Sequence, residues 1–208
     1  MIITIGRQTG SGGHRIAKLV AERLGYKFYD REILNMAAED SGFDRSFFEK
    51  NDEKHGFFRN FFGLSVATGS VTSYSNDYSN RLSQEALYLC QAEAIRRAAA
   101  DGDCVFIGRC ADYVLRDFPD MVSVFITSDL ADRALLVASR TEMTVEQAEK
   151  FIRHREETRA SFYKYYTGKK WGDSASYDLC INTSKLTESQ VVEIICNYVF
   201  YFEKKQRS

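Results

Sequence analysis

The sequence predicts an α/β protein in which a parallel sheet of about five strands carries helices on both faces. Short apolar runs alternate with longer amphipathic segments along the chain, which is typical of repeated strand–helix units. The apolar runs do not alternate with polar residues, so the strands are buried on both sides and pair in parallel. A length of 208 residues suits one compact domain spanning 1–208.

Composition narrows the classes of partner. Hydrophobic residues make up 44% of the chain, charged residues 27%, and the net charge is −1, so we expect neither nucleic acid nor anionic lipid as a partner. No apolar run approaches the roughly 20 residues that span a bilayer, and the first residues do not resemble a signal peptide. The five cysteines include no CxxC pair and the histidines are scattered. We therefore expect a cytoplasmic protein with reduced thiols and without a structural metal centre.

Each element follows from local pattern. Strands are predicted in five apolar runs, 2–5, 26–30, 104–108, 121–127 and 179–182. Helices are predicted over 14–24, 31–39, 81–102, 128–140 and 144–159, and after 187 to the C-terminus. Gly25 ends the first helix, and Ser128 is suited to cap the fourth. T-x-x-Q capping boxes at Thr144 and Thr187 begin the last two.

One long segment has no period. Residues 42–80 are rich in aromatics, Gly, Ser and Asn. Long irregular stretches of this kind in compact domains are usually functional loops, so we expect an irregular insert there. A disordered excursion is the alternative.

A glycine-rich loop joins the first strand to the first helix. It reads GRQTGSGGHR over 6–15. Its glycines allow backbone N–H groups to converge on phosphate oxygens, at the positive end of the following helix. The expected phosphate-binding residues are Gly6, Gly10, Ser11, Gly12, Gly13, His14 and Arg15.

This loop departs from the P-loop pattern G-x-x-x-x-G-K-[ST]. It is one residue longer, Gly13 stands where lysine would be, and Arg15 stands where a hydroxyl is expected. Arg15 and Arg7 are the local cations that can replace the lysine. A tight turn without a ligand is the alternative.

Further charged residues follow predicted strands or share a helical face. Arg109 follows the third strand, and Asp30 ends the second; the carboxyl ends of parallel strands form the usual ligand site of such sheets. Arg155 and Arg159 are four residues apart, so they share one helical face. Bland alternatives remain open: a solvated helix face for the two arginines, and a helix N-cap for Asp30.

Longer motifs carry a family resemblance. The segment VFIGRCADYVLRDFPDMVSVFITSDLADRAL, 105–135, resembles bacterial cytidylate kinases, in which a strand leads into a Gly-Arg-Asp turn, Phe-Pro-Asp, a second strand and an Arg-bearing helix. Residues 153–195 are similar to the lid and C-terminus of those enzymes. The chain is similar to a cytidylate kinase-like group, whose members share four of its segments: the GSGG loop, FYD, YYTGKKWGD and YDLCINTS.

The resemblance implies a three-layer P-loop NTPase-like fold, with 42–80 as an acceptor-side insert and about 140–177 as a lid. It implies ATP and Mg²⁺ as cofactors. The glycine loop would hold the donor phosphates, and Asp30 would lie near the acceptor phosphate and metal. Arg109 would hold the acceptor monophosphate, while Arg155 and Arg159 would close over the transferring group.

Two departures bear on activity. Gly13 replaces the lysine, and Cys110 replaces the aspartate of the Gly-Arg-Asp turn, which leaves Asp112 as a shifted substitute in acceptor binding. An arginine can offset the lost lysine, because phosphoryl transfer depends on positioning and on positive charge. We therefore expect Arg15 to act in catalysis together with Asp30, Arg155 and Arg159.

The expected function is ATP-dependent phosphoryl transfer to a small-molecule phosphate acceptor, with a nucleoside monophosphate favoured. The alternatives are a catalytically weak or inactive nucleotide-binding sensor and an oligomeric interaction protein on the same fold. A second copy of the chain is a further candidate partner.

Overall fold

The computed structural model describes residues 1–30 and 76–206. Within them, five strands form one parallel sheet in the order β2-β3-β1-β4-β5. The strands are β1 (Ile2–Arg7), β2 (Lys27–Tyr29), β3 (Cys104–Ile107), β4 (Met121–Thr127) and β5 (Leu179–Asn182). Since all five pair in parallel, their carboxyl ends meet at one edge of the sheet, and the predicted fold class is confirmed.

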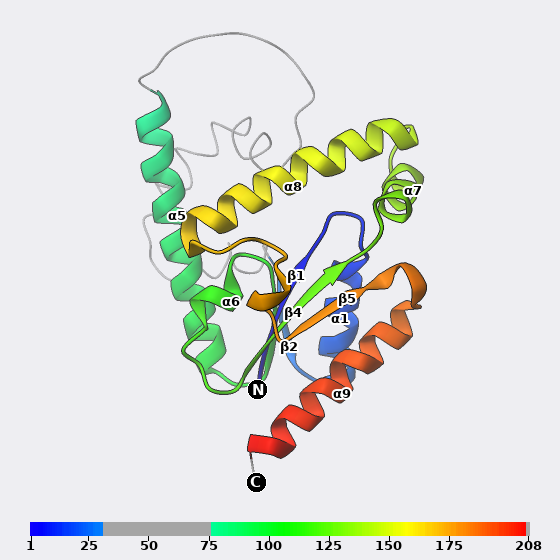
Figure 1. Ribbon diagram of the computed structural model, residues 1–208. Coiled ribbons are helices and arrows are strands. Elements are labelled where there is room, and N and C mark those ends of the chain that lie inside the picture. The colour runs from blue at the N-terminus through cyan, green and yellow to red at the C-terminus, as the bar shows by residue number, and fades with distance from the viewer. Residues whose placement is uncertain (31–75, 207–208) are drawn as a thin grey trace.

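Helices cover both faces of this sheet (Figure 1). They are α1 (Gly13–Leu24), α5 (Asn76–Ala100), α6 (Ala111–Val114), α7 (Leu130–Arg140), α8 (Val145–Thr167) and α9 (Glu188–Gln206). One core lies between the sheet and α1 with α9, where Ile3 and Ile5 are buried. A second core lies on the opposite face beneath α5 and α6, where Ile2 and Phe106 are buried. The side chains of β1 thus alternate between two cores, which explains why the strand is rich in isoleucine on both faces.

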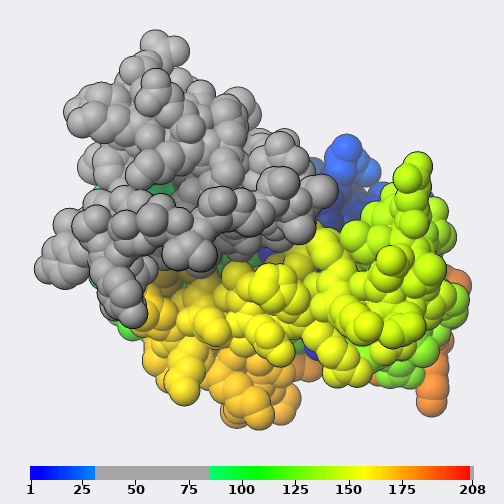
Figure 2. Space-filling model, turned by 90° about the horizontal axis from the view of Figure 1, so that it is seen from above, coloured from blue at the N-terminus to red at the C-terminus, as the bar shows by residue number. Residues whose placement is uncertain are grey.

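Helix α8 lies outside these layers, at the carboxyl-end edge of the sheet. Its first half packs against α7 through a small cluster that includes Ala134, Ala148 and Ile152. Seen from above, α8 runs across this end of the molecule with α7 beside it (Figure 2). The chain that follows, which includes a 3₁₀ turn at Ser174–Ser176, returns to the sheet as β5.

Three sequence predictions need correction at their boundaries. The segment predicted to be irregular, 42–80, is helical from Asn76 onward. The helix can begin there because α5 contains no Gly or Pro between Asn76 and Ala100. Helix α8 continues past Arg159 to Thr167, since its last turns bury Tyr163, and it ends at Gly168. The predicted cap of α7 is also displaced: Asp129 takes the N-cap position, while the Ser128 hydroxyl lies 2.9 Å from that of Ser184.

Some of the remaining predictions are confirmed, and others concern residues outside the described ranges. Both T-x-x-Q boxes form, with the Gln147 N–H donating to Thr144 Oγ1 and the Gln190 N–H donating to Thr187 Oγ1. The helix predicted over 31–39 and the insert from 42 to 75 lie outside the described ranges. Of the thiols, only that of Cys180 is exposed. None of the helices, within the part of the chain described, is long and apolar enough to cross a membrane.

Candidate active site

A cavity of about 290 Å³ lies at the carboxyl ends of β1 and β3, against α8. Its volume is near the lower end of the roughly 300–1,000 Å³ of small-molecule sites. Basic groups outnumber acidic ones in its lining: Arg7, Arg109, Arg155, Arg159, His14 and His154 against Asp30 and Asp112. Although the net charge of the chain is −1, the lining of this cavity is therefore suited to an anion.

The glycine loop reaches the cavity through its two ends, where Gly6, Arg7 and His14 line it. Gly10 and Gly12 adopt positive φ angles of 83° and 75°, which glycine tolerates without strain. Gly12 is the N-cap of α1 and supplies no side-chain cap. The first N–H groups of α1 thus remain available to an anion. The Ser11 hydroxyl, predicted as a phosphate donor, instead donates to the Gln8 carbonyl at 2.9 Å and shapes the loop.

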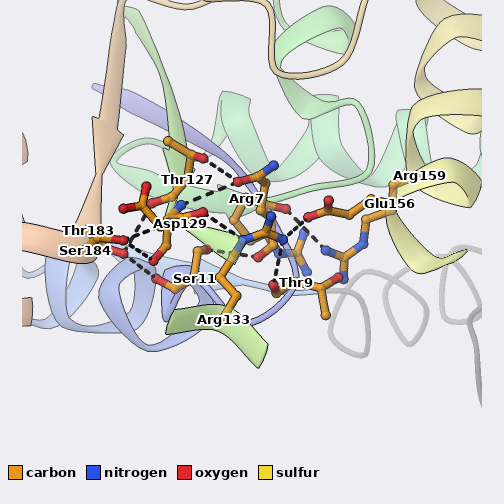
Figure 3. Close-up of polar contacts among 12 residues, drawn as sticks. Arg7, Thr9, Ser11, Thr127, Asp129, Arg133, Glu156, Arg159, Thr183 and Ser184 are labelled. Atoms are coloured by element: carbon orange, nitrogen blue, oxygen red, sulfur yellow. Dashed lines mark hydrogen bonds and ion pairs between the residues drawn. The ribbon is translucent and has the colours of Figure 1, made fainter. Parts of the chain in front are cut away.

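A buried ion pair ties this loop to the predicted lid. Arg133 of α7 is 5% exposed; its Nε donates to the Ser128 carbonyl at 2.8 Å, and its Nη1 donates to the Thr9 carbonyl at 3.3 Å. The same Nη1 donates to Glu156 of α8. Figure 3 shows the Arg133 guanidinium between Thr9 and Glu156. Three elements therefore converge on one side chain, which positions α8 over the loop.

Glu156 completes this contact from the other side. Its carboxylate accepts a hydrogen bond from the Thr9 backbone N–H, and burial raises its pKa although the facing Arg133 acts in the opposite direction. The Arg133–Glu156 contact was not predicted from the sequence. Its one local signal is that Arg133 lies four residues before Val137, on the apolar face of a helix.

The two predicted lid arginines both line the cavity. Arg159 Nη1 donates to the carbonyl of Arg7 at 3.2 Å, so α8 also contacts the end of β1. The Arg155 guanidinium carbon lies 5.2 Å from the centre of the Phe151 ring. Their spacing of four residues places them on the cavity side of α8, so a purely solvated face no longer describes them.

Arg109 enters the cavity from a strained turn after β3. Gly108, Arg109 and Cys110 have φ angles of 74°, 59° and 54°. A left-handed backbone costs a non-glycine residue about 1–2 kcal/mol, and such strain is concentrated at functional sites. Cys110 then serves as the N-cap of α6. The turn thereby holds Arg109 at the same edge of the sheet as Arg7.

Asp112, from the first turn of α6, lies on the cavity wall with a tyrosine partner. The Tyr163 hydroxyl donates to Asp112 Oδ2 at 2.6 Å. Burial raises the pKa of Asp112, and this hydrogen bond offsets the effect only in part. Burial, followed by the charge of Asp112, raises the pKa of the Cys110 thiol to about 12. Cys110 is therefore a neutral thiol and does not replace the charge of an aspartate.

Asp30, at the end of β2, is the second cavity carboxylate. His14 Nε2 lies 3.4 Å from Asp30 Oδ2, and its ring packs edge-on against Phe28 at 5.6 Å. No cluster of three or more His, Cys, Asp or Glu side chains suited to a metal occurs among the described residues. A Mg²⁺ ion that arrives with nucleotide phosphates needs only one or two protein carboxylates. Asp30 fits that requirement.

The aromatic residues near the end of α8 divide into two groups. Tyr166 stacks on Tyr88 of α5 with ring centres 3.8 Å apart, and the Tyr165 hydroxyl donates to Glu85 at 2.6 Å. These contacts serve packing between α8 and α5. By contrast, Tyr163 and Trp171 line the cavity.

Five of the predicted site residues do not line the cavity: Gly10, Ser11, Gly12 and Gly13, which lie in the loop between Arg7 and His14, and Arg15. Arg15 points away from the cavity. Its Nε lies 2.9 Å from Glu188 Oε2 at the start of α9, its side chain is 66% exposed, and it does not line the cavity. Consecutive helical residues point about 100° apart, so when His14 faces the cavity, Arg15 faces α9. Arg7, the other local cation named from the sequence, is the one in the cavity.

The fold and this site together define an α/β protein with the fold of the P-loop kinases. The chain belongs to the cytidylate kinase-like family, which it matches over residues 2–185. It is 28% identical over 204 residues to a cytidylate kinase of Methanopyrus kandleri, a match that covers 94% of this chain and 91% of the relative.

Two solved structures support the same fold. An uncharacterised protein from Eubacterium ventriosum superposes with a TM-score of 0.72 at 26% identity, covering 96% of this chain and 98% of its own. A gluconokinase from Sinorhizobium meliloti superposes with a TM-score of 0.53 at 14% identity, covering 99% and 94% of the two chains. The second likeness concerns the fold alone.

Proposed function

We propose that the protein transfers a phosphoryl group from ATP to a nucleoside monophosphate, with CMP as the first acceptor to test. One observation carries this proposal. Four arginines from β1, the turn after β3 and α8 line one cavity at the carboxyl edge of the sheet, beside Asp30. Phosphoryl transfer needs positioning and positive charge around the transferring group more than covalent chemistry. The family and its named relatives support the same reaction class.

The roles follow from position. The glycine loop and the N-terminus of α1 bind the donor phosphates through backbone N–H groups. Arg109 holds the phosphate of the acceptor, and Arg155 and Arg159 approach the transferring group from α8. Asp30 would hold Mg²⁺, which neutralises phosphate charge when it is bound with ATP. Asp112 and Tyr163 bind the acceptor on the α6 side of the cavity.

Nucleotide binding without turnover is the second candidate. It is favoured by Gly13 at the position of the usual lysine and by the neutral thiol of Cys110 at the position of an aspartate. A protein of this kind would act as a sensor.

The two candidates differ in one measurement, ADP release from Mg·ATP in the presence of each nucleoside monophosphate. The variant is Arg109→Ala, and the matched control is Arg116→Ala, an exposed arginine whose Nη1 donates to the Tyr113 carbonyl. We expect turnover with at least one acceptor, lowered about 10³-fold in Arg109→Ala and unchanged in the control. ATP binding without ADP release in the presence of any of the acceptors would favour the sensor.

A further inference from the structure

Arg7, the last residue of β1, crosses the N-terminus of α1 at the position where the lysine is missing. A Cβ atom added to Gly13 would lie 2.5 Å from Arg7 Cβ and 3.0 Å from Arg7 Cγ. Real Cβ atoms do not approach other atoms so closely, and Arg7 Cβ is fixed to the strand. Any side chain at position 13 would therefore compete with Arg7 for the same space. The loss of lysine and the placement of Arg7 are two aspects of one arrangement.

The far end of Arg7 reaches the second loop that borders the cavity. A Cβ atom added to Gly108 would lie 2.1 Å from Arg7 Nη1 and 3.3 Å from its guanidinium carbon. Arg7 thus extends from α1 to the turn that carries Arg109, and both arginines line the cavity. The Arg7 carbonyl also accepts the hydrogen bond from Arg159 at 3.2 Å. The backbone of Arg7 is therefore held by the pairing of β1 with β4 on one side and by α8 on the other.

We propose that Arg7 is the phosphate-binding cation that replaces the missing lysine, and that Gly13 and Gly108 are small because they accommodate its side chain. This inference rests on the proposed function, in that the anion it assigns to Arg7 is the phosphate chain of the donor nucleotide. A guanidinium offers a planar pair of donors that matches two phosphate oxygens, whereas lysine supplies a point charge. Arg15 does not compete for this role, because it pairs with Glu188 outside the cavity.

Calorimetric titration with ADP tests the role directly. Arg7→Ala is compared with Arg7→Lys and with Arg23→Ala, an exposed arginine in the last turn of α1. We expect Arg7→Ala to weaken ADP binding about tenfold to a hundredfold, the range of one charge-assisted contact. Adenosine binding should not change, Arg7→Lys should retain part of the ADP affinity, and Arg23→Ala all of it. An Arg7→Ala variant that binds ADP within about twofold of wild type would overturn the assignment, since such a change is far below one charged hydrogen bond.

A steric exchange provides an independent test. Gly13→Lys alone introduces a Cβ atom against Arg7, so we expect it to weaken ADP binding. The double variant Arg7→Gly with Gly13→Lys removes both the Cβ and the Cγ atom that cause the clash and restores a lysine to the usual P-loop position. It should bind ADP about tenfold more tightly than Arg7→Gly alone, as expected for one restored charged contact. Thermal unfolding of wild type, Gly13→Lys, Arg7→Gly and the double variant establishes that each is folded. A double variant that binds ADP no more tightly than Arg7→Gly would contradict the proposal.

The outcomes separate this inference from the proposed function. Wild type that binds ADP through Arg7 but releases no ADP with any acceptor would refute the kinase and leave Arg7 as the phosphate ligand. Turnover that Arg7→Ala leaves intact would refute the inference and leave the kinase standing. Wild type that binds no ADP at all would overturn the inference as well, because Arg7 would then hold no nucleotide phosphate.

Discussion

The two loops that border the cavity are built in opposite ways. The loop after β1 places glycine at both of its left-handed positions, Gly10 and Gly12. The turn after β3 uses one glycine, Gly108, and then forces Arg109 and Cys110 into the same conformation. The first loop follows from local sequence, since glycine adopts these angles freely. The second is imposed by its surroundings.

Packing explains how the second loop bears its strain. The Cys110 side chain is 5% exposed, and Ala111 and Leu115 are buried in the core beneath α5. These contacts hold the backbone after Arg109 in place. As a result, Arg109 lines the cavity. The glycine loop can therefore be predicted from its own residues, whereas the turn that carries Arg109 depends on the core behind it.

The largest expected effect comes from removing Arg133, the side chain of α7 that contacts the glycine loop. Arg133→Ala leaves the half-buried Glu156 carboxylate without its guanidinium partner, and breaking a buried pair in this way costs about 3–5 kcal/mol. Arg15→Ala removes an exposed pair and should cost less than about 1 kcal/mol. Urea denaturation of both variants measures the contrast. Equal losses would show that the glycine loop needs no anchor on α7.

The second prediction concerns the neutral thiol in the strained turn. Cys110→Asp introduces a carboxyl into a buried position beside Asp112, and Arg109 offsets only part of the penalty. We expect a loss of about 3 kcal/mol at pH 7, against about 1 kcal/mol for Cys110→Ser. The loss should shrink at acid pH, as the introduced carboxyl is protonated. Urea denaturation at pH 7 and pH 4.5 measures the stability losses of both variants. A Cys110→Asp variant as stable as Cys110→Ser at pH 7 would contradict the prediction.

The third prediction compares two glycines with nearly equal backbones. Gly25 and Gly108 have φ angles of 71° and 74°, but only Gly108 meets another side chain, the guanidinium of Arg7. Alanine at either site should cost about 1–2 kcal/mol of stability through backbone strain. The flexible end of Arg7 can move aside, so the clash adds little to that loss. It displaces the guanidinium, however, and only Gly108→Ala should weaken ADP binding; equal affinities in calorimetry would contradict this placement of Arg7.

The smallest expected effect is a gain in stability. Burial holds the pKa of Asp112 above its ordinary value of 3.8. The stability contributed by this proton is therefore present below pH 3.8 and lost as pH rises through the raised pKa. Asp112→Asn keeps an acceptor for Tyr163 and removes the charge, so we expect about 1 kcal/mol more stability at pH 7.

This gain should shrink toward pH 3.5, because Asp112 becomes protonated first in the folded state and then, below pH 3.8, mostly in the unfolded state as well. Tyr163→Phe is the matched control, because it removes the hydrogen bond and keeps the charge. It should lower stability at pH 7. Thermal unfolding of the three proteins between pH 3.5 and pH 7 measures these differences in stability. An Asp112→Asn variant less stable than wild type at pH 7 would contradict the predicted gain.

Much of the fold was predictable from short stretches of sequence. The apolar runs of β1 and β4 predicted buried strands, which the structure places at the centre of the sheet, and the boxes at Thr144 and Thr187 mark the starts of α8 and α9. The end of α8 was placed too early. Its last turns are polar and aromatic, and they are supported by tertiary contacts such as the stacking of Tyr166 on Tyr88 of α5.

The candidate site was predictable in part. Asp30, Arg109, Asp112, Arg155 and Arg159 were named from the sequence, and the structure gathers all of them around one cavity. The sequence could not show whether Arg7 or Arg15 faces the cavity, because both lie beside the glycine loop in the chain. The Arg133–Glu156 pair was not accessible either, since 23 residues separate its members.

By itself, the sequence determined the order of strands and helices, the glycine loop and the family, because turn chemistry and apolar spacing act over a few neighbouring residues. Tertiary structure decided which arginines face the cavity and how Arg109 is held there. A long side chain takes its direction from what packs around it, and here that means Gly13 and Gly108 beside Arg7, and the core beneath α5 behind Cys110.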